Sequence, residues 1–471
     1  MSNMKVTISG YTTVFDNTNR WTKKGISPDF QIKIEYKVGD NVTTQNYLSY
    51  EDLAIVIPVR KNPETGEKEF GLVEQEAPAL IHKEGNSKTP EGYKGIMLEG
   101  MSVAIPKENI ETKKIAEYIK DAYHIDTKGI VDLDTTRTSV LESFSNQCAN
   151  FYTAGVIGED ENNQVHWFPI SSLRDFLEMQ RMANNKDVHT SISTLYALEL
   201  LYEKYFEEIK NQKGFELEEK LPELIVLKTM DKNKGYRFSI KECYYINTND
   251  YTPKELANIV SALNNIPEEE IDLHEDDNTD RPYVLLPREN EEPLRVEVKV
   301  GSYAQSNMKF QQSNAGNTML VTQNGDRLLS PQIRSPFLRE NTYIRLGGSG
   351  GMLEPGEEDL RKRALKELLE EQGVKDDKVE ELTGVIAASP NCTEMSQCFL
   401  TKYDKAIDVG ELDLDEAGEF IGEKIPFSHD KIKGQPRIAL TTKYYDQVIH
   451  RLEKEREADE IQHKKELEER E

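Results

Sequence analysis

The first part of the chain shows the apolar and polar spacing of β-strands. Residues 30–36, FQIKIEY, alternate with a period of two, and residues 53–59, LAIVIPV, form a continuous apolar run typical of a buried strand. A turn over residues 62–66 predicts a hairpin that returns through residues 70–75, FGLVEQ. We therefore expect a sheet near the N-terminus.

Helical spacing appears in four places. Residues 111–123 place Ile115 and Ile119 on one face, and residues 191–212 form a strong amphipathic pattern. Residues 252–266 predict a helix capped by Thr252. The acidic run that follows, residues 267–280, reads as a loop, and the charged residues from about 440 predict a C-terminal helix in solvent.

The second half repeats the style of the first. Residues 293–303 predict one strand, and residues 317–334 predict a hairpin around an Asn-Gly turn. A glycine-rich stretch and a helix follow, so the two outer segments resemble copies of one design. One alignment of the two helices keeps apolar positions and alters charged ones: Glu117 falls on Glu367, Ile115 on Leu365, Ile119 on Leu369, Lys120 on Glu370 and Tyr123 on Gly373.

Composition narrows the class of protein. A chain of 471 residues with 37% hydrophobic residues is long enough for two or three packed domains. Its formal net charge of −26 argues against nucleic acid and anionic membranes as general partners. The four cysteines have no metal-ligand spacing, and the N-terminus has no signal-peptide pattern, so we expect a cytoplasmic protein without a membrane span.

Clustered carboxylates are the candidate chemistry. Glu367, Glu370 and Glu371 fall within an arc of roughly 100° on the predicted helix. Carboxylate oxygens gathered in this way suit a hard divalent cation, Mg²⁺ or Mn²⁺. The preceding glycines allow the backbone to approach a metal and a phosphate closely. A solvated acidic helix would show the same cluster, and the flanking pattern favours the metal site.

That flanking pattern resembles the box of the Nudix hydrolase family. Residues 366–374, KELLEEQGV, match its second half, and residues 350–358, GGMLEPGEE, match its first half. Lys366 replaces the family's arginine, and there is one extra residue: it precedes Lys366 if Glu357 is the Glu of the box, and it lies in the glycine loop if Glu358 is. The first copy lacks most of the glycines and has Lys120 where a metal-binding Glu is expected, so we predict that it is degenerate and catalytically silent.

The resemblance implies a fold, a domain organisation and an activity. The fold class is α/β, with two α/β/α sandwiches around mixed sheets. The expected boundaries are 1–185 for the degenerate copy, 186–285 for an α/β middle segment, 286–438 for the Nudix domain and 439–471 for a charged helix. The implied activity is Mg²⁺-dependent hydrolysis of the pyrophosphate bond in a nucleoside diphosphate derivative, with ADP-ribose or another nucleotide sugar favoured.

The resemblance also assigns roles to residues. Two late carboxylates, Glu416 and Glu419, are candidates for the general base, and the helix glutamates for the metal ligands, with Glu371 also catalytic. Features similar to ADP-ribose pyrophosphatases suggest five substrate-binding residues: Arg334, Glu354, Lys366, Pro390 and Glu394.

Two other functions remain open from the sequence. The altered box also fits a non-catalytic protein that binds or senses nucleotide sugars. The middle segment and the charged tail would suit a scaffold. A small nucleotide is the expected partner in the first two cases. The two copies predict either a monomer that mimics a dimer or a homodimer.

Overall fold

The chain was analysed as a computed structural model. It describes residues 6–16, 30–38, 41–81, 94–107, 110–140, 145–157, 165–182, 188–206, 208–209, 221–234, 238–264, 266–267, 270–276, 279–288, 291–306, 314–334, 336–337, 344–354, 356–375, 379–389, 392–403 and 424–468.

The first large sheet has seven strands in the order β10-β5-β4-β9-β8, with β6 on β5 and β7 on β4. Its strands are β4 (Asp52–Lys61), β5 (Lys68–Glu76), β6 (Ile96–Glu99), β7 (Met101–Ile105), β8 (Asp126–Ser139), β9 (Cys148–Ile157) and β10 (Val165–Pro169). Helix α1 (Thr112–Tyr123) packs on β7 and β8, and it buries Ile115 and Ile119 as the spacing predicts. The predicted hairpin is confirmed by the antiparallel pair β4 and β5.

The second large sheet has eight strands in the order β19-β18-β17-β23-β21, with β20 on β17, β22 on β23 and β24 on β18. Its strands are β17 (Asn314–Thr322), β18 (Arg327–Ile333), β19 (Ile344–Gly347), β20 (Ser349–Met352), β21 (Glu380–Glu381), β22 (Ile386–Ala387), β23 (Met395–Tyr403) and β24 (Ile425–Phe427). Helix α5 (Leu360–Gln372) lies against β17 and β20.

The two large sheets share one pattern of strand pairing. Each has a single parallel pair at its centre, β4 with β9 and β17 with β23. Each central strand also pairs with an antiparallel hairpin partner, β5 or β18, and with a short strand before the helix, β7 or β20. The hairpin partners carry equivalent outer strands, β6 and β10 in one sheet and β19 and β24 in the other. The chain thus contains the same mixed α/β topology twice.

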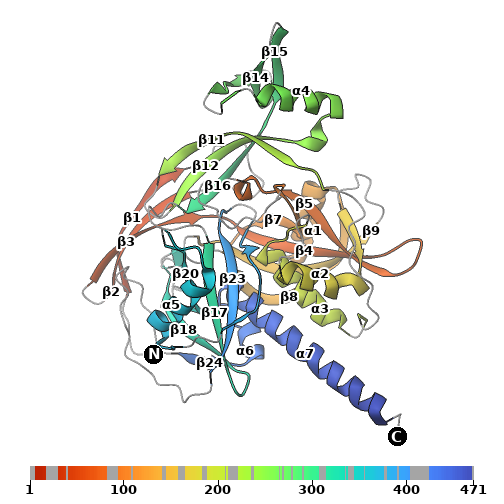
Figure 1. Cartoon of the computed structure of the whole chain (residues 1–471), viewed down its shortest axis with the longest axis vertical. Helices are drawn as coiled ribbons and strands as arrows, with labels where there is room; N and C mark the ends of the chain where they lie inside the picture. The colour runs from red at the N-terminus through yellow and green to blue at the C-terminus, as the bar shows by residue number, and fades with distance from the viewer. Residues whose placement is uncertain are drawn as a thin grey trace.

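Three smaller antiparallel sheets lie outside these two (Figure 1). They contain β1 (Val6–Asp16), β2 (Phe30–Val38) and β3 (Asn41–Ser49); β11 (Leu224–Lys234), β12 (Phe238–Asn247) and β16 (Lys299–Ser306); and β13 (Leu273–Asp276), β14 (Thr279–Arg288) and β15 (Glu291–Glu297). Helix α4 (Pro253–Leu263) packs on β14, and Thr252 caps it through a reciprocal bond with Glu255, as predicted.

Two predictions for this region are wrong. The acidic residues 267–280 were expected to form a loop, but they contain β13 and the start of β14. Residues 293–303 were expected to form one strand, but they divide between β15 and β16, which belong to different sheets. In the first case two adjacent acidic segments pair as a hairpin, and in the second β16 pairs with β12, which is distant in sequence; local charge and periodicity report neither pairing.

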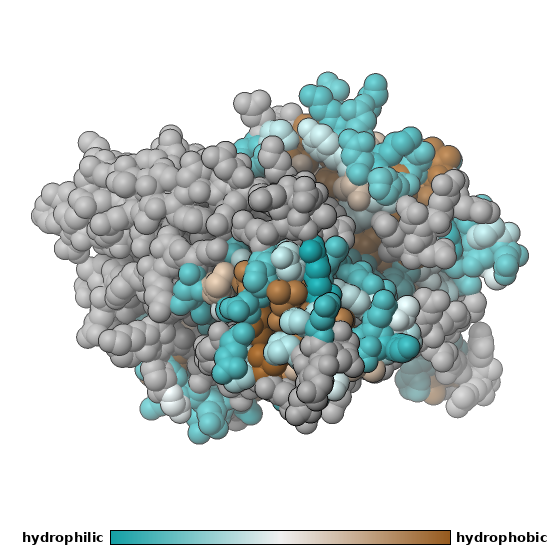
Figure 2. Space-filling view, turned by 90° about the horizontal axis from the view of Figure 1, so that it is seen from above, coloured by the Kyte–Doolittle hydropathy of each residue, from teal (hydrophilic) through white to brown (hydrophobic). Residues whose placement is uncertain are grey.

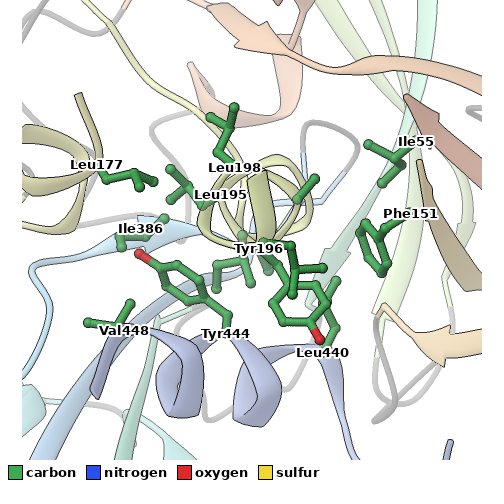
Figure 3. Close-up of a cluster of buried hydrophobic side chains, with 14 of the residues drawn as sticks. Ile55, Phe151, Leu177, Leu195, Tyr196, Leu198, Ile386, Leu440, Tyr444 and Val448 are labelled. Carbon is green, nitrogen blue, oxygen red and sulfur yellow. The ribbon is translucent and has the colours of Figure 1, made fainter. Parts of the chain in front are cut away.

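One hydrophobic core joins the two large sheets through two helices. Helix α3 (Ile192–Tyr205) is buried along most of its length, and the first part of α7 (Leu440–Glu468) packs against it. Figure 3 shows Leu195 and Tyr196 of α3 between Phe151 of the first sheet and Ile386 of the second, with Tyr444 of α7 below. The predicted middle segment, 186–285, therefore begins with a helix of the main core.

Helix α7 departs from the prediction of a solvated tail. Tyr444, Tyr445, Val448 and Ile449 are 0–4% exposed, and only the residues beyond about 455 are mostly exposed. This apolar spacing is that of an amphipathic helix, and the high charge of the following residues obscured it.

Buried ion pairs connect α7 to its surroundings. Lys443 donates to Asp134 of β8 at 2.9 Å, and Arg451 donates to Glu199 of α3 at 2.9 Å. The Arg327 guanidinium of β18 lies 2.6 Å from Asp446. Because each partner belongs to a different element, α7 holds both sheets and α3 together.

The remaining short helices are α2 (Leu173–Arg181) and α6 (His429–Lys433), with 3₁₀ turns at η1 (Pro78–Leu80), η2 (Ile170–Ser172) and η3 (Thr248–Asp250). No helix in the described ranges is long and apolar enough to cross a membrane. On the face shown in Figure 2, hydrophilic residues cover most of the described surface and hydrophobic ones form small patches between them.

Candidate functional site

Helix α5 is placed against the sheet by its ends and by one glycine of the central strand. Asp359 caps the helix by accepting from the backbone N–H groups of Arg361 and Lys362 at 3.0 and 3.1 Å. The helix ends at Gly373, whose φ of +63° suits a residue without a side chain. A Cβ on Gly316 of β17 would lie 2.4 Å from the carbonyl oxygen of Leu360, so only glycine permits this close packing.

Glu367 is buried directly against the glycine strand β20. A Cβ on Gly351 would lie 2.1 Å from Oε1 of Glu367, so the glycine makes room for the carboxylate. The Glu367 side chain is only 10% exposed and forms an ion pair with Arg363, one turn earlier on the helix. The close approach of backbone to carboxylate, inferred from the glycines of the sequence, is therefore present at this residue.

Glu371 contacts the same strand one residue away. Its Oε2 accepts a hydrogen bond from the backbone N–H of Gly350 at 3.0 Å. Glu370, by contrast, is exposed. Glu367 and Glu371 of α5 thus contact adjacent glycines of β20, whereas the side chain of Glu370 is exposed to solvent.

Arg363 is a site residue that the sequence argument missed. Its buried guanidinium lies 2.6 Å from Glu354 and also pairs with Glu367. Lys366, placed by the family resemblance where an arginine is expected, is 42% exposed and forms an ion pair with Glu354 at 3.0 Å. Arg363 precedes Lys366 by three residues, so one face of the helix carries both cations. The three-residue spacing between Arg363 and Lys366 is the feature of the sequence that could have identified Arg363 as a site residue.

Lys366 and Arg363 both donate hydrogen bonds to Glu354, a residue that the sequence predicts to bind substrate. Hydrogen bonds from Lys366 and Arg363 lower the pKa of Glu354, although the carboxylate is largely exposed. The same bond to Glu354 raises the pKa of Lys366. Arg363, Lys366 and Glu354 therefore form a small network of opposite charges beside β20, in which each charge stabilises its neighbours.

Arg334 and Glu394 lie near each other. The charge of Arg334 opposes the effect of burial on Glu394, and burial prevails and raises the pKa of that carboxyl to about 7. Oε2 of Glu394 is buried and has no hydrogen-bond partner among the described residues. Arg334 also donates to Gln332 of β18. Three predicted residues, Pro390, Glu416 and Glu419, lie outside the described residues.

The carboxylates that α5 holds beside β20 have the donor atoms that a hard divalent cation prefers. Oxygen ligands from Glu367 and Glu371 next to Gly350 and Gly351 suit Mg²⁺ or Mn²⁺. Within the described residues, however, the box glutamates do not form a cluster with ligand atoms inside 4.8 Å of one another. The donor chemistry of Glu367 and Glu371 therefore suits the ion, but these side chains, together with Glu370, would have to move closer to one another to share it.

In the first copy a tyrosine makes the contact between the helix and the short strand. Tyr123 of α1 accepts from the backbone N–H of Ser102 on β7 at 3.0 Å, as Glu371 accepts from Gly350 in the second copy, although Tyr123 is one residue further along its helix. Burial raises the pKa of Tyr123, so its hydroxyl stays uncharged. A neutral hydroxyl bonded to the strand gives a divalent cation no charged ligand at this position.

The helix register in the first copy differs from the sequence alignment by one residue. Ala364 and Leu368 are fully buried in α5, whereas Leu369 is 48% exposed. Ile115 and Ile119 are the fully buried pair of α1, so they correspond to Ala364 and Leu368. The left-handed caps His124 and Gly373 then coincide as well. Tyr118, Asp121 and Ala122 consequently occupy the positions of the box glutamates, and Lys120 does not.

No protein-family model matches the chain, and no curated protein matches its sequence. Among solved structures, the crystal structure of an ADP compounds hydrolase is similar to 44% of this chain and 98% of its own, with 13% identity and a TM-score of 0.31. A likeness of this size carries no argument about function.

Proposed function

We propose that the second copy hydrolyses the pyrophosphate bond of a nucleoside diphosphate derivative, with ADP-ribose or another nucleotide sugar as the favoured substrate. The observation that supports this proposal most is the close contact of Glu367 with Gly351 and the hydrogen bond from the backbone N–H of Gly350 to Glu371. The glycines let the backbone of β20 approach the carboxylates closely, and backbone N–H groups exposed in this way can also bind a phosphate.

We assign a separate role in the proposed reaction to each group of site residues. Glu367 and Glu371, joined by Glu370, would hold Mg²⁺ or Mn²⁺, which supplies charge neutralisation and an activated water when bound. Arg363 and Lys366 fix Glu354 at the entrance. Arg334 is a cation for a substrate phosphate, and Glu394 is a carboxyl whose pKa near 7 allows it to accept or donate a hydrogen bond. Glu416 and Glu419 remain the proposed general bases.

The test is a panel of nucleoside diphosphate derivatives incubated with the full chain and Mg²⁺ or Mn²⁺, with products identified by mass. We expect cleavage between the two phosphorus atoms and its loss in Glu371→Gln. Glu380→Gln is the matched control, because Glu380 is an exposed carboxylate on β21 away from the glycine strand. Equal turnover by both variants would refute the assignment.

A second function is favoured by one contact. The ion pair between Arg363 and Glu367 already gives a metal-binding carboxylate a cation from the protein itself. A site that keeps this pair would bind a nucleotide sugar without cleaving it. Saturable binding of ADP-ribose by calorimetry, with no product after prolonged incubation with either metal, would support the binding protein over the hydrolase.

A further inference from the structure

A second group of metal-ligand side chains lies away from the glycine strand, where α3, α6 and α7 meet. Glu203 near the end of α3, His429 at the start of α6 and His450 of α7 each offer a ligand atom, and these atoms lie within 4.8 Å of one another. Within the described chain, this is the grouping of three or more acidic, histidine or cysteine side chains that meets that distance.

His429 is oriented by a carboxylate behind it. Its Nδ1 lies 2.7 Å from Oδ2 of Asp446, and Asp446 is itself held by Arg327 at 2.6 Å. Because a carboxylate accepts, Nδ1 carries the proton and Nε2 presents its lone pair. Nε2 is buried and has no hydrogen-bond partner among the described residues. A carboxylate that fixes the tautomer of a histidine is the usual support of a metal-binding imidazole.

His450 lies face to face with His429. Their ring centroids are 3.7 Å apart and their planes differ by 12°. The lone pair of an imidazole nitrogen lies in the ring plane, so one of the two rings has to rotate before both can bind the same ion. Their ligand atoms already lie within 4.8 Å of each other.

Glu203 is the third candidate ligand, and one of its two carboxylate oxygens is hydrogen-bonded to neighbouring side chains. Its Oε2 accepts from Lys433 at 2.7 Å and from Gln447 at 3.2 Å. These contacts leave Oε1 for a further interaction. Lys433 also neutralises Glu203, so it competes with any metal ion for this carboxylate.

We propose that Glu203, His429 and His450 bind a first-row transition-metal cation of the zinc class. Two imidazoles and one carboxylate are a ligand set that Zn²⁺ takes with a fourth position left for water, and imidazole disfavours the harder Mg²⁺. The ligands come from three helices, two of which pack on the shared core. The ion would therefore join α6 and the preceding strand β24 to α3 and α7.

The experiment uses the full chain without a polyhistidine tag, stripped with a chelator and titrated with Zn²⁺ by calorimetry, with bound metal measured by elemental analysis. We expect one Zn²⁺ per chain at this site. His450→Gln and His429→Gln should each weaken binding by about tenfold or more. Lys433→Met should tighten it, because the competing cation is gone.

Controls separate this site from other binding. His463→Gln changes an exposed histidine of α7 and should leave the affinity unchanged. Glu371→Gln should also leave it unchanged, because that residue lies on α5 beside the glycine strand and is not one of the three ligands. Circular dichroism of each metal-free variant checks that the fold is retained. Wild-type affinity in folded His450→Gln, or no Zn²⁺ bound by the wild type above the level of that variant, would overturn the proposal.

Discussion

The substitution Gly351→Ala tests how the glycine strand positions Glu367. The added Cβ would lie 2.1 Å from Oε1 of Glu367, and ordinary contact begins at 3.4 Å, so the carboxylate must move by about 1.3 Å. Misplacing a catalytic group by roughly 1 Å costs on the order of 10²-fold in rate. We therefore expect turnover to fall by about 10²-fold.

Stability should change much less than turnover. The atoms that the new methyl group meets all belong to the side chain of Glu367, which can rotate away and break its ion pair with Arg363. Overpacking of this kind costs about 1–3 kcal/mol, and the loss of unfolded-state freedom at a glycine offsets up to roughly 1 kcal/mol. A urea titration followed by circular dichroism measures the difference.

The assay compares initial rates of pyrophosphate cleavage with saturating Mg²⁺. Gly155→Ala is the control, because a Cβ there would sit at 3.5 Å from Lys128, an ordinary contact in the first sheet. That variant should keep its full rate. If Gly351→Ala also keeps its full rate, the position of Glu367 does not matter and the reasoning from the glycine strand is wrong.

Three further predictions concern the buried charges. Burial raises the pKa of Glu99 from 4.5 to about 7, so the folded state binds its proton more tightly than the unfolded state does. The free energy of unfolding should therefore fall by about 3 kcal/mol between pH 4.5 and 7 relative to Glu99→Gln, and a flat difference across that range would contradict the assignment. Arg451→Met leaves Glu199 buried without its partner and should cost about 3–5 kcal/mol in chemical denaturation; adding Glu199→Leu should restore most of it, and failure of that rescue would count against the pair. Lys443→Met should destabilise by a similar amount through Asp134, and an unchanged unfolding midpoint would show that this contact contributes nothing.

Much of the second copy follows from local sequence. The Asn-Gly hairpin forms as β17 and β18, and the helix at 360–372 forms between an aspartate cap and a glycine. Turn chemistry and capping act over a few residues, so the sequence reports them directly. The presence of glutamates at the glycine strand follows from the same local pattern.

Most of the features that the sequence did not predict depend on contacts between residues far apart in the chain. Tyr444 and Val448 of α7 are buried by α3 and the second sheet, and the charged residues after them hide that face from a composition argument. Arg363 is a different case, because its partners Glu354 and Glu367 are near it in the chain, and it was missed because the family pattern pointed to Lys366 instead. The helix register of the repeat also needed observed burial, since two amphipathic helices align equally well one residue apart.

The most direct test of the central claim is a single-turnover reaction of the full chain with ADP-ribose and Mg²⁺, in wild type and Glu371→Gln, with products identified by mass. The account predicts AMP and ribose 5-phosphate from the wild type, and a loss of at least about 10²-fold in the variant. Product formation at the same rate in both proteins, or none in the wild type with any nucleoside diphosphate derivative, would contradict it.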